Sequence, residues 1–343
     1  MSGLEFRPGH FKAPADAAGA RQLFTQTVTN VIVEISSYCN RQCAYCPVSN
    51  VDRVTERQVV PEAMWAKILD DLAGVSYAES LCLNLYNEPM ADRPLLLARI
   101  REARERLPGC RIYFSTNGDY LSRDYVKAMV EAGLSELYVT IHMPKGRPYD
   151  DAYAISRFTE LSKRLAKATK IERVVAGSTV QGTITLFGLP INVFSMNYDV
   201  YGTDRAGSVQ SLTNAKFHRR SPCARPFHDF TVSYEGTIFP CCQMFVDDEQ
   251  HRELYAIGKV TDFPDIFQAW ASQAMAGWRA ELLRFSAKKS PCDSCNLDCR
   301  EPVPGEAQQL DALYREYVGP ITDTLPATRR PIFLRWLGEK KRG

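Results

Sequence analysis

The sequence predicts an α/β fold: a partial (β/α)6 TIM-like barrel followed by a small cysteine-rich α+β domain. Three observations support this prediction. Strand-like and helical stretches alternate from residue 30 to about residue 200, as in parallel sheets whose strands are joined by crossover helices. Six such strands are too few for a closed eight-stranded barrel but suit an open one. Near residue 200 the alternation ends, and a cysteine-rich segment follows at residues 222–304.

The barrel strands are expected in short apolar runs, and the helices in amphipathic stretches between them. We expect strands at Asn30–Ile35, Ser80–Tyr86, Arg111–Ser115, Glu136–His142, Arg173–Ser178 and Ile191–Asp199. We expect helices at Pro61–Ala73, Arg93–Leu107, Arg123–Ala132 and Tyr153–Ala168. In parallel barrels the chemistry gathers at the C-terminal ends of the strands. Residues that directly follow the strand-like runs are therefore the first candidates for a site.

The C-terminal part has a different pattern. Phe230–Phe239 predicts a hairpin that turns at Glu235-Gly236. Helical patterns follow at Pro264–Phe285 and Glu306–Tyr317, and residues 329–342 form a basic tail with interleaved apolar residues. We expect the tail to pack on the protein, with an anionic lipid surface or a nucleic acid as alternatives. The expected domains are an extension (1–29), the barrel (30–205), the cysteine-rich domain (206–305) and a helix with the tail (306–343).

Composition excludes several classes of protein. The chain has 343 residues, 45% of them hydrophobic, which is enough for a large core. Its 42 basic and 40 acidic residues nearly balance, so no nucleic-acid partner is expected. No run of eighteen apolar residues predicts a membrane span, and the N-terminus lacks the pattern of a signal peptide. We therefore expect a cytoplasmic protein.

The eleven cysteines are clustered rather than scattered. Cytoplasmic thiols are kept reduced, so metal or cluster ligation explains the clusters better than disulfides do. A stretch of eight positions shortly after the first strand contains three of the cysteines, Cys39, Cys43 and Cys46. A structural zinc ion or a simple electron-transfer cluster takes four protein ligands. Three close cysteines without a nearby fourth indicate a cubane cluster with one iron open to a small molecule.

The motif Cys39-x3-Cys43-x2-Cys46, with Tyr45 before the last cysteine, resembles the signature of the radical S-adenosylmethionine (radical SAM) superfamily. The resemblance implies that the three thiolates hold a [4Fe–4S] cluster whose open iron binds SAM. Reductive cleavage of SAM would release a 5′-deoxyadenosyl radical that removes a hydrogen atom from the substrate. In such a reaction the cofactor supplies the difficult chemistry and the protein supplies orientation.

Two later motifs resemble further parts of the family's SAM site. Asn87 and Glu88 lie in a stretch similar to the Gly-Gly-Glu-Pro motif, although Asn87 replaces a glycine. The resemblance implies that Glu88 accepts a hydrogen bond from the SAM ammonium group. Ser115 and Asn117 end the third strand, where the family often has residues that contact the ribose; both are alternatively ordinary turn residues. His142 ends the fourth strand and is either an active-site group or a structural histidine.

A second constellation consists of Cys223, Cys241, Cys292 and Cys295. Four converging thiolates suit either a closed iron–sulfur cluster or a structural zinc ion. The segment also resembles the SPASM/twitch domain of radical SAM enzymes, which implies one auxiliary [4Fe–4S] cluster with these four ligands. Two cysteines are left over at positions 242 and 299. Cys242 and Cys299 are expected to be structural, with hydrogen-atom donation as the alternative and ligand replacement as a further one for Cys299.

The resemblance implies dehydrogenation of a small polar alcohol, similar to an amino sugar or cyclitol, with the second electron leaving through the auxiliary cluster. Arg205 follows the last barrel strand and is the candidate for a substrate contact or acid–base helper. A flavodoxin- or ferredoxin-type protein would donate the first electron. One alternative is epimerisation with a cysteine hydrogen donor. Another is peptide modification, which the lack of a segment long enough for a leader-binding module disfavours. A zinc-stabilised binding module leaves the three-cysteine loop unexplained.

Overall fold

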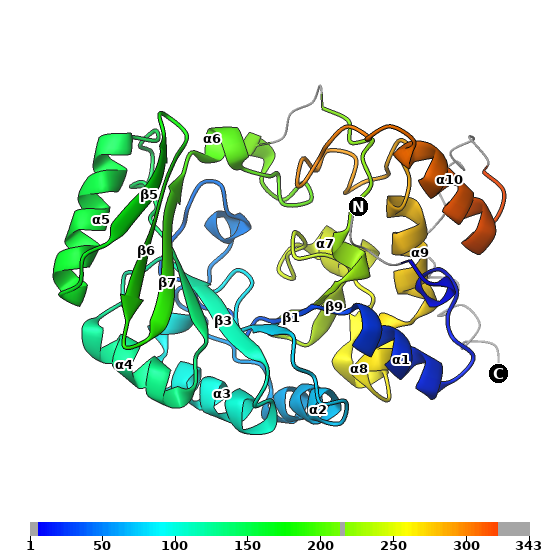
Figure 1. The fold of residues 1–343 in the computed structure, drawn as a ribbon, viewed down its shortest axis with the longest axis horizontal. Coiled ribbons are helices and arrows are strands. Elements are labelled where there is room, and N and C mark those ends of the chain that lie inside the picture. The colour runs from blue at the N-terminus through cyan, green and yellow to red at the C-terminus, as the bar shows by residue number, and fades with distance from the viewer. Residues whose placement is uncertain (1–5, 213–216, 322–343) are drawn as a thin grey trace.

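A computed structural model of the chain describes residues 6–212 and 217–321. One ten-stranded sheet runs through the molecule in the order β10-β9-β8-β1-β2-β3-β4-β7-β6-β5 (Figure 1). The strands are β1 (Asn30–Val33), β2 (Ser80–Cys82), β3 (Arg111–Thr116), β4 (Glu136–Thr140), β5 (Lys170–Val175), β6 (Thr179–Leu186), β7 (Leu189–Met196), β8 (Asp229–Val232), β9 (Thr237–Phe239) and β10 (Gly258–Lys259). The partial barrel with a C-terminal cysteine-rich part is confirmed.

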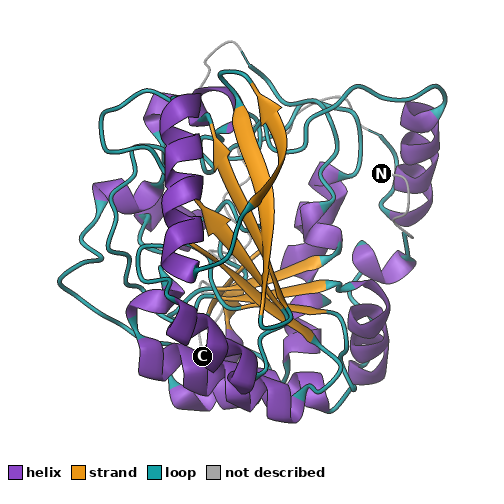
Figure 2. Ribbon diagram, turned by 60° about the vertical axis from the view of Figure 1, so that its left-hand side comes forward, coloured by secondary structure: helices purple, strands orange, loops and turns teal. Residues whose placement is uncertain are grey.

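Helices cover the outer face of the curved sheet, while its inner face borders the centre of the molecule (Figures 1 and 2). The helices are α1 (Ala17–Thr27), α2 (Glu62–Ala73), α3 (Arg93–Arg106), α4 (Arg123–Ala132), α5 (Asp151–Leu165), α6 (Tyr198–Tyr201), α7 (Glu249–Leu254), α8 (Ile266–Trp270), α9 (Gln273–Leu282) and α10 (Glu306–Tyr317). The four helices expected in the barrel are present with ends shifted by at most a few residues. Helix α1 lies in the N-terminal extension, for which we made no prediction of secondary structure.

Local sequence signals fix where the barrel helices begin. Asp92, Ser122 and Asp150 directly precede α3, α4 and α5, and each side chain accepts a hydrogen bond from a backbone amide in the first turn. Such caps satisfy amides that have no partner within the helix. Gly133 ends α4 in the left-handed region, at φ 103°, which a glycine adopts without strain.

The six parallel strands of the barrel differ from the expected set. Strands β8, β1, β2, β3, β4 and β7 pair in parallel. The prediction of a barrel strand at Arg173–Ser178 is wrong in its role, since β5 pairs antiparallel with β6 at the sheet edge. Strand β6 also pairs antiparallel with β7, so these three strands form a meander. The sequence reading missed β6 because this meander needs only tight turns where crossover helices were expected.

The cysteine-rich part continues the barrel sheet instead of forming a sheet of its own. Strand β8 pairs in parallel with β1, and β9 returns antiparallel to β8 as the predicted hairpin. Gly236 makes its turn at φ 80°. The predicted helix at Pro264–Phe285 is divided into α8 and α9, and α10 has the predicted bounds. The predictions for the basic tail lie outside the described residues.

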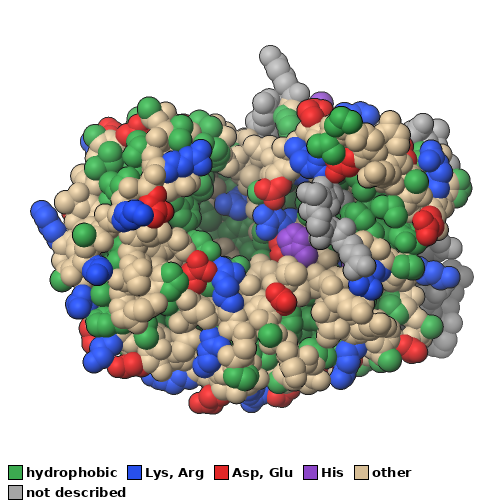
Figure 3. Space-filling view, in the orientation of Figure 1, with side chains coloured by type: hydrophobic (Ala, Val, Ile, Leu, Met, Phe, Trp, Pro, Cys, Tyr) green, Lys and Arg blue, Asp and Glu red, His purple; other side chains and the backbone are tan. Residues whose placement is uncertain are grey.

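Alternation along the strands separates the two faces of the sheet. Residues such as Ile112, Phe114 and Val139 are buried in the main core under the helices. The positions between them carry polar side chains, including Arg111 and Glu136, whose charged groups are 2.7 Å apart. A hollow with acidic, basic and histidine side chains opens at the centre of one face of the molecule (Figure 3). Within the described part of the chain, no helix has the length and apolarity needed to cross a membrane.

Candidate functional site

The loop after β1 brings Cys39, Cys43 and Cys46 together. The backbone amide of Cys39 donates to the Arg53 carbonyl at 3.3 Å, and the amide of Cys46 donates to the Cys43 carbonyl at 2.9 Å. Ser49 donates its hydroxyl to the Cys46 carbonyl at 2.8 Å. Burial raises the pKa of all three thiols, that of Cys39 to about 12. They would therefore lose their protons only on binding a cation such as iron.

Polar contacts tie this loop to the end of β3. The Asn117 side chain donates to Asn40 Oδ1 at 2.8 Å. The Arg41 guanidinium donates to both carboxylate oxygens of Asp119, at 2.7 and 2.5 Å. Asn117 is thus a link between the two predicted parts of the SAM site, whatever further contact it makes.

Glu88 is buried at the end of the segment that follows β2. Its carboxylate accepts hydrogen bonds from Thr116 Oγ1 (2.7 Å) and from the backbone amides of Asn117 (2.7 Å) and Met90 (3.0 Å). Burial raises the pKa of this carboxyl to about 7 although these bonds favour its charged form. After burial, the negative charge of Glu88 is the next cause that raises the pKa of Cys39, ahead of the neighbouring thiols, so the two groups are close. This position suits a carboxylate that meets an ammonium group beside the cluster.

Asn87 and Ser115 differ in how free their side chains are for contact with SAM. The Asn87 side chain donates to Ser36 Oγ at 3.3 Å and accepts from the Leu85 amide at 3.2 Å. It therefore supports the local backbone. Ser115 donates its backbone amide to Asn84 Oδ1 at 2.8 Å, and its side chain lies on the inner face of β3. Their proposed cofactor contacts stay predictions.

Tyr45 and His142 form a neutral pair beside the cysteine loop. The Tyr45 hydroxyl and His142 Nδ1 are 2.6 Å apart. Burial raises the pKa of Tyr45 and lowers that of His142 to about 3, so neither group is charged near neutral pH. Tyr198 stacks on Tyr45 with ring centroids 3.7 Å apart. No local pattern predicts a role for Tyr198, because its contact forms only when the end of β7 folds over the loop.

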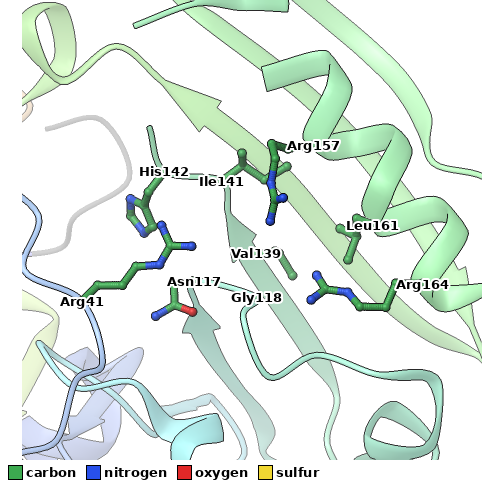
Figure 4. Close-up of a pocket in the computed structure, with 9 residues that line it drawn as sticks. All are labelled: Arg41, Asn117, Gly118, Val139, Ile141, His142, Arg157, Leu161 and Arg164. Atoms are coloured by element: carbon green, nitrogen blue, oxygen red, sulfur yellow. The ribbon is translucent and has the colours of Figure 1, made fainter. Parts of the chain in front are cut away.

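A pocket of about 300 Å³ adjoins this pair at the ends of β3 and β4. Asn117 and His142 line it, as Figure 4 shows, and Arg41, Arg157 and Arg164 reach into it from the cysteine loop and from α5. Two of the predicted site residues therefore share one basic pocket. The pocket lies next to the expected SAM site rather than apart from it.

The four predicted auxiliary ligands surround a second cavity. Cys223, Cys241, Cys292 and Cys295 all line a largely apolar cavity of about 390 Å³. No three His, Cys, Asp or Glu side chains of the described residues gather closely enough for a single metal ion. The thiolates of a cubane cluster bind different irons and therefore stand around a space, as these do. Burial raises the pKa of Cys223, Cys292 and Cys295, and cationic iron would offset that cost. The donor set and the cavity fit such a cluster.

The two remaining cysteines of this region do not line the cavity. Cys299 donates its thiol to the Cys295 carbonyl at 3.4 Å. The carbonyl of Cys242 accepts a hydrogen bond from the Tyr86 hydroxyl at 3.1 Å. A hydrogen bond with Cys241 lowers the pKa of the Cys242 thiol to about 7. Structural roles and hydrogen-atom donation both stay predictions for this pair.

Arg205 lies between the two cysteine sites. Its guanidinium is 5.9 Å from the centroid of the Tyr86 ring, and its buried Nε has no hydrogen-bond partner among the described residues. The negative charges that the Cys46 and Cys242 thiols can carry both act to raise the pKa of Arg205, so the guanidinium is near both thiols. The neighbouring Ala206 lines the four-cysteine cavity. Arg205 is therefore well placed to contact a substrate between the clusters.

Two contacts that the sequence reading missed hold the turn of Arg205. The residues at 205, 206 and 207 all have positive φ, between 51° and 90°. His251 accepts from the Phe245 amide at Nδ1 (2.9 Å), so its Nε2 carries the proton and donates to the Ala206 carbonyl (2.8 Å). Asp204 accepts from the Ser294 hydroxyl at 2.5 Å, which ties the turn to the loop that carries Cys292 and Cys295.

A buried ion-pair network also joins the two sites. Arg53 donates to Glu34 and to Asp247, each at 2.6 Å, and its guanidinium lies 4.5 Å from the centroid of the Phe245 ring. Both Arg53 and Glu34 are almost fully buried. Glu34 stands in an otherwise apolar strand-like run, which is a signal that the sequence reading passed over. Phe245 in turn packs in a small apolar cluster with Tyr86 and the cysteine loop.

Comparisons with known proteins agree with this geometry. Residues 33–190 match the radical SAM superfamily, and residues 223–300 match SPASM, an iron–sulfur cluster-binding domain. An S-adenosyl-L-methionine-dependent 2-deoxy-scyllo-inosamine dehydrogenase of Niallia circulans is 26% identical over 265 residues, 77% of this chain and 91% of that protein. A PqqA peptide cyclase of Methylocella silvestris is 24% identical over 288 residues, 80% of this chain and 69% of that protein. The crystal structure of BtrN in complex with AdoMet and 2-DOIA is similar in fold, with TM-score 0.56, 20% identity and coverage of 79% of this chain and 94% of that one.

Proposed function

Because this chain belongs to the radical SAM superfamily and carries a C-terminal SPASM-type iron–sulfur cluster-binding domain, we propose that it oxidises a small aminocyclitol or similar amino-sugar alcohol to the ketone. The chain is a radical SAM oxidoreductase, and its cofactors are SAM and [4Fe–4S] clusters. The proposal depends on one observation: a loop with three thiols and a cavity with four thiols flank the same arginine. The similarity to a 2-deoxy-scyllo-inosamine dehydrogenase supports the substrate class.

The residues of each site have separate roles in this proposal. The three cysteines of the loop would hold the SAM-binding cluster, and the four around the cavity would hold the auxiliary cluster. When bound, these groups supply a radical that takes the hydrogen atom of the carbinol C–H bond and an acceptor for the remaining electron. Glu88 holds its carboxylate ready for the SAM ammonium group through three hydrogen bonds.

Arg205 would act on the substrate hydroxyl. Its unpartnered Nε can donate to the hydroxyl oxygen and stabilise negative charge there as the proton leaves to water. A guanidinium keeps its own proton in proteins, so Arg205 is a donor rather than a general base. The alcohol thus loses one hydrogen atom, one proton and one electron, which together convert it to the ketone.

A flavodoxin- or ferredoxin-type donor would deliver the first electron. We also propose a cytoplasmic location, because eleven unpaired cysteines need a reducing compartment.

The test uses the reconstituted full chain under anaerobic conditions with SAM, a reductant and 2-deoxy-scyllo-inosamine or related aminocyclitols. We expect equal amounts of 5′-deoxyadenosine and ketone, measured by mass spectrometry. A redox-neutral product that contains one solvent deuterium would replace dehydrogenation by epimerisation, with Cys242 or Cys299 as the donor to test next. Turnover of a peptide and of none of the aminocyclitols would contradict the substrate class.

A further inference from the structure

A buried arginine, Arg219, lines the four-cysteine cavity and is only 2% exposed. Its guanidinium donates to the carbonyls of Ser221 (3.0 Å) and Pro222 (2.7 Å), which precede the first cysteine of the cavity. It also donates to the carbonyls of Cys295 (3.3 Å) and Leu297 (2.8 Å) and lies 4.0 Å from the Cys295 sulfur. One side chain therefore joins the two segments that carry three of the four cysteines.

This guanidinium has no carboxylate partner among residues 6–212 and 217–321. Nearby Arg225, by contrast, pairs with Asp229 and Asp298. Carbonyl oxygens solvate a guanidinium, but they do not neutralise its charge, and a buried charge without a counter-ion is costly. The groups that can become negative around Arg219 are the cysteine thiols themselves.

We propose that Arg219 is the buried counter-charge of the auxiliary cluster, holding its two cysteine segments together and raising its reduction potential. A cluster bound by four thiolates is negatively charged and gains further negative charge on reduction. A fixed positive charge beside it stabilises the reduced form more than the oxidised form, and outer contacts of this kind tune cluster potentials. Arg219 thereby makes the cluster a better acceptor for the substrate electron. The inference rests on the auxiliary cluster of the proposed function.

The chain offers a matched control. Arg220 is the next residue and carries the same charge, but its side chain is exposed, so water and salt screen it. The experiment introduces Arg219→Gln, Arg219→Lys or Arg220→Gln into a full-length background in which the three cysteines of the first loop are alanine. Only the auxiliary cluster then contributes to the signal. The readouts are the iron content and the midpoint potential from a redox titration followed by electron paramagnetic resonance.

We expect roughly four irons per chain in the background protein, as for one [4Fe–4S] cluster. A background protein without this iron would overturn the auxiliary cluster and the role of Arg219 together, whereas the comparison of the variants tests Arg219 alone. Arg219→Gln should lower the midpoint potential clearly more than Arg220→Gln does. Arg219→Lys should stay near the parent potential but lose iron faster on dialysis, because lysine keeps the charge and cannot reach four carbonyls.

Equal potentials in Arg219→Gln and Arg220→Gln would overturn the electrostatic part of the proposal. Undiminished iron retention in both Arg219 variants would overturn the structural part. If Arg219→Gln fails to retain iron, the structural part is supported. The electrostatic part is then decided by the salt dependence of the potential in the background protein, which a buried charge should leave small and a screened surface charge should make large.

Discussion

The two cysteine sites reach the same ligand chemistry by different routes. The first takes three cysteines from eight consecutive positions of one loop, and the second takes four from segments spread between Cys223 and Cys295. The first therefore needs mainly its own loop and the strand ends beneath it. The second needs the hairpin, two helices and Arg219 to bring its ligands to one cavity. A substitution that disturbs packing should therefore affect the second site more than the first. Substitution of a cysteine in one site should abolish the function of that site and leave the function of the other.

Loss of a ligand from each site should have the largest effect. Cys46→Ala should reduce 5′-deoxyadenosine formation to background, because the SAM-binding cluster loses one of its three ligands. Cys292→Ala should retain SAM cleavage and lose ketone formation. The measurement is the yield of both products by mass spectrometry, with Cys110→Ser as the control because that thiol is buried away from both sites. Normal ketone formation by Cys292→Ala would remove the functional distinction between the sites.

Removal of the ion-pair network tests how firmly the sites are joined. Arg53→Met should lower the free energy of unfolding by about 3–5 kcal/mol, because it leaves buried Glu34 and Asp247 without their partner. Denaturant unfolding of the iron-free protein measures the effect. Arg93→Met is the matched control, since its pair with Asp124 is exposed and should contribute under about 1 kcal/mol. Similar losses in the two variants would mean that the buried network does not connect the sites.

The pH dependence of SAM binding should arise from the first site alone, through the carboxyl group of Glu88. The raised pKa of Glu88, about 7 instead of 4.5, means that the native state retains a proton between these pH values that the unfolded chain has lost. Without SAM, the contribution of Glu88 to stability therefore falls as the pH rises through this range. SAM needs the charged carboxylate, so its affinity should fall up to about tenfold per pH unit below pH 7.

Equilibrium binding of SAM between pH 6 and pH 8 measures this dependence (the range is roughly one unit on each side of the raised pKa). Glu88→Gln should bind SAM more weakly at the upper pH and show a flatter profile. The iron content of the four-cysteine site should stay unchanged over the same range. A profile as steep in Glu88→Gln as in the parent would assign the titration to another group.

Local patterns made the first site predictable, and long-range pairing limited what could be predicted of the rest. The spacing of Cys39, Cys43 and Cys46 lies within one loop, and the barrel helices follow amphipathic stretches with capping residues. The pairing of β8 with β1 could not be predicted in this way, because any strand edge with a suitable face can accept another strand. The role of Arg219 could not be predicted either, since no spacing in the sequence indicates which carbonyl groups a buried guanidinium will contact.

The four cysteines of the cavity could be grouped in advance because the hairpin turn at Gly236 and the pair Cys292 and Cys295 restrict the chain. The choice of Cys241 over Cys242 depended on the resemblance, because spacing alone does not distinguish two adjacent cysteines. The two cysteines lie in the turn that follows β9, and the course of this turn decides that Cys241 and not Cys242 lines the cavity. The meander of β5, β6 and β7 was missed for a related reason, since antiparallel neighbours need no helix between them.

The pairing of β8 with β1 also sets an order of events during synthesis on the ribosome. One edge of β1 has no neighbour until Asp229–Val232 has left the exit tunnel, long after the first cysteine loop has emerged. We therefore expect the nascent barrel to remain open at this edge, and both sites to receive iron only once the chain is nearly complete. Hydrogen exchange on chains arrested before Asp229 should find the β1 amides unprotected. In this protein, cofactor delivery and the last step of folding would then coincide.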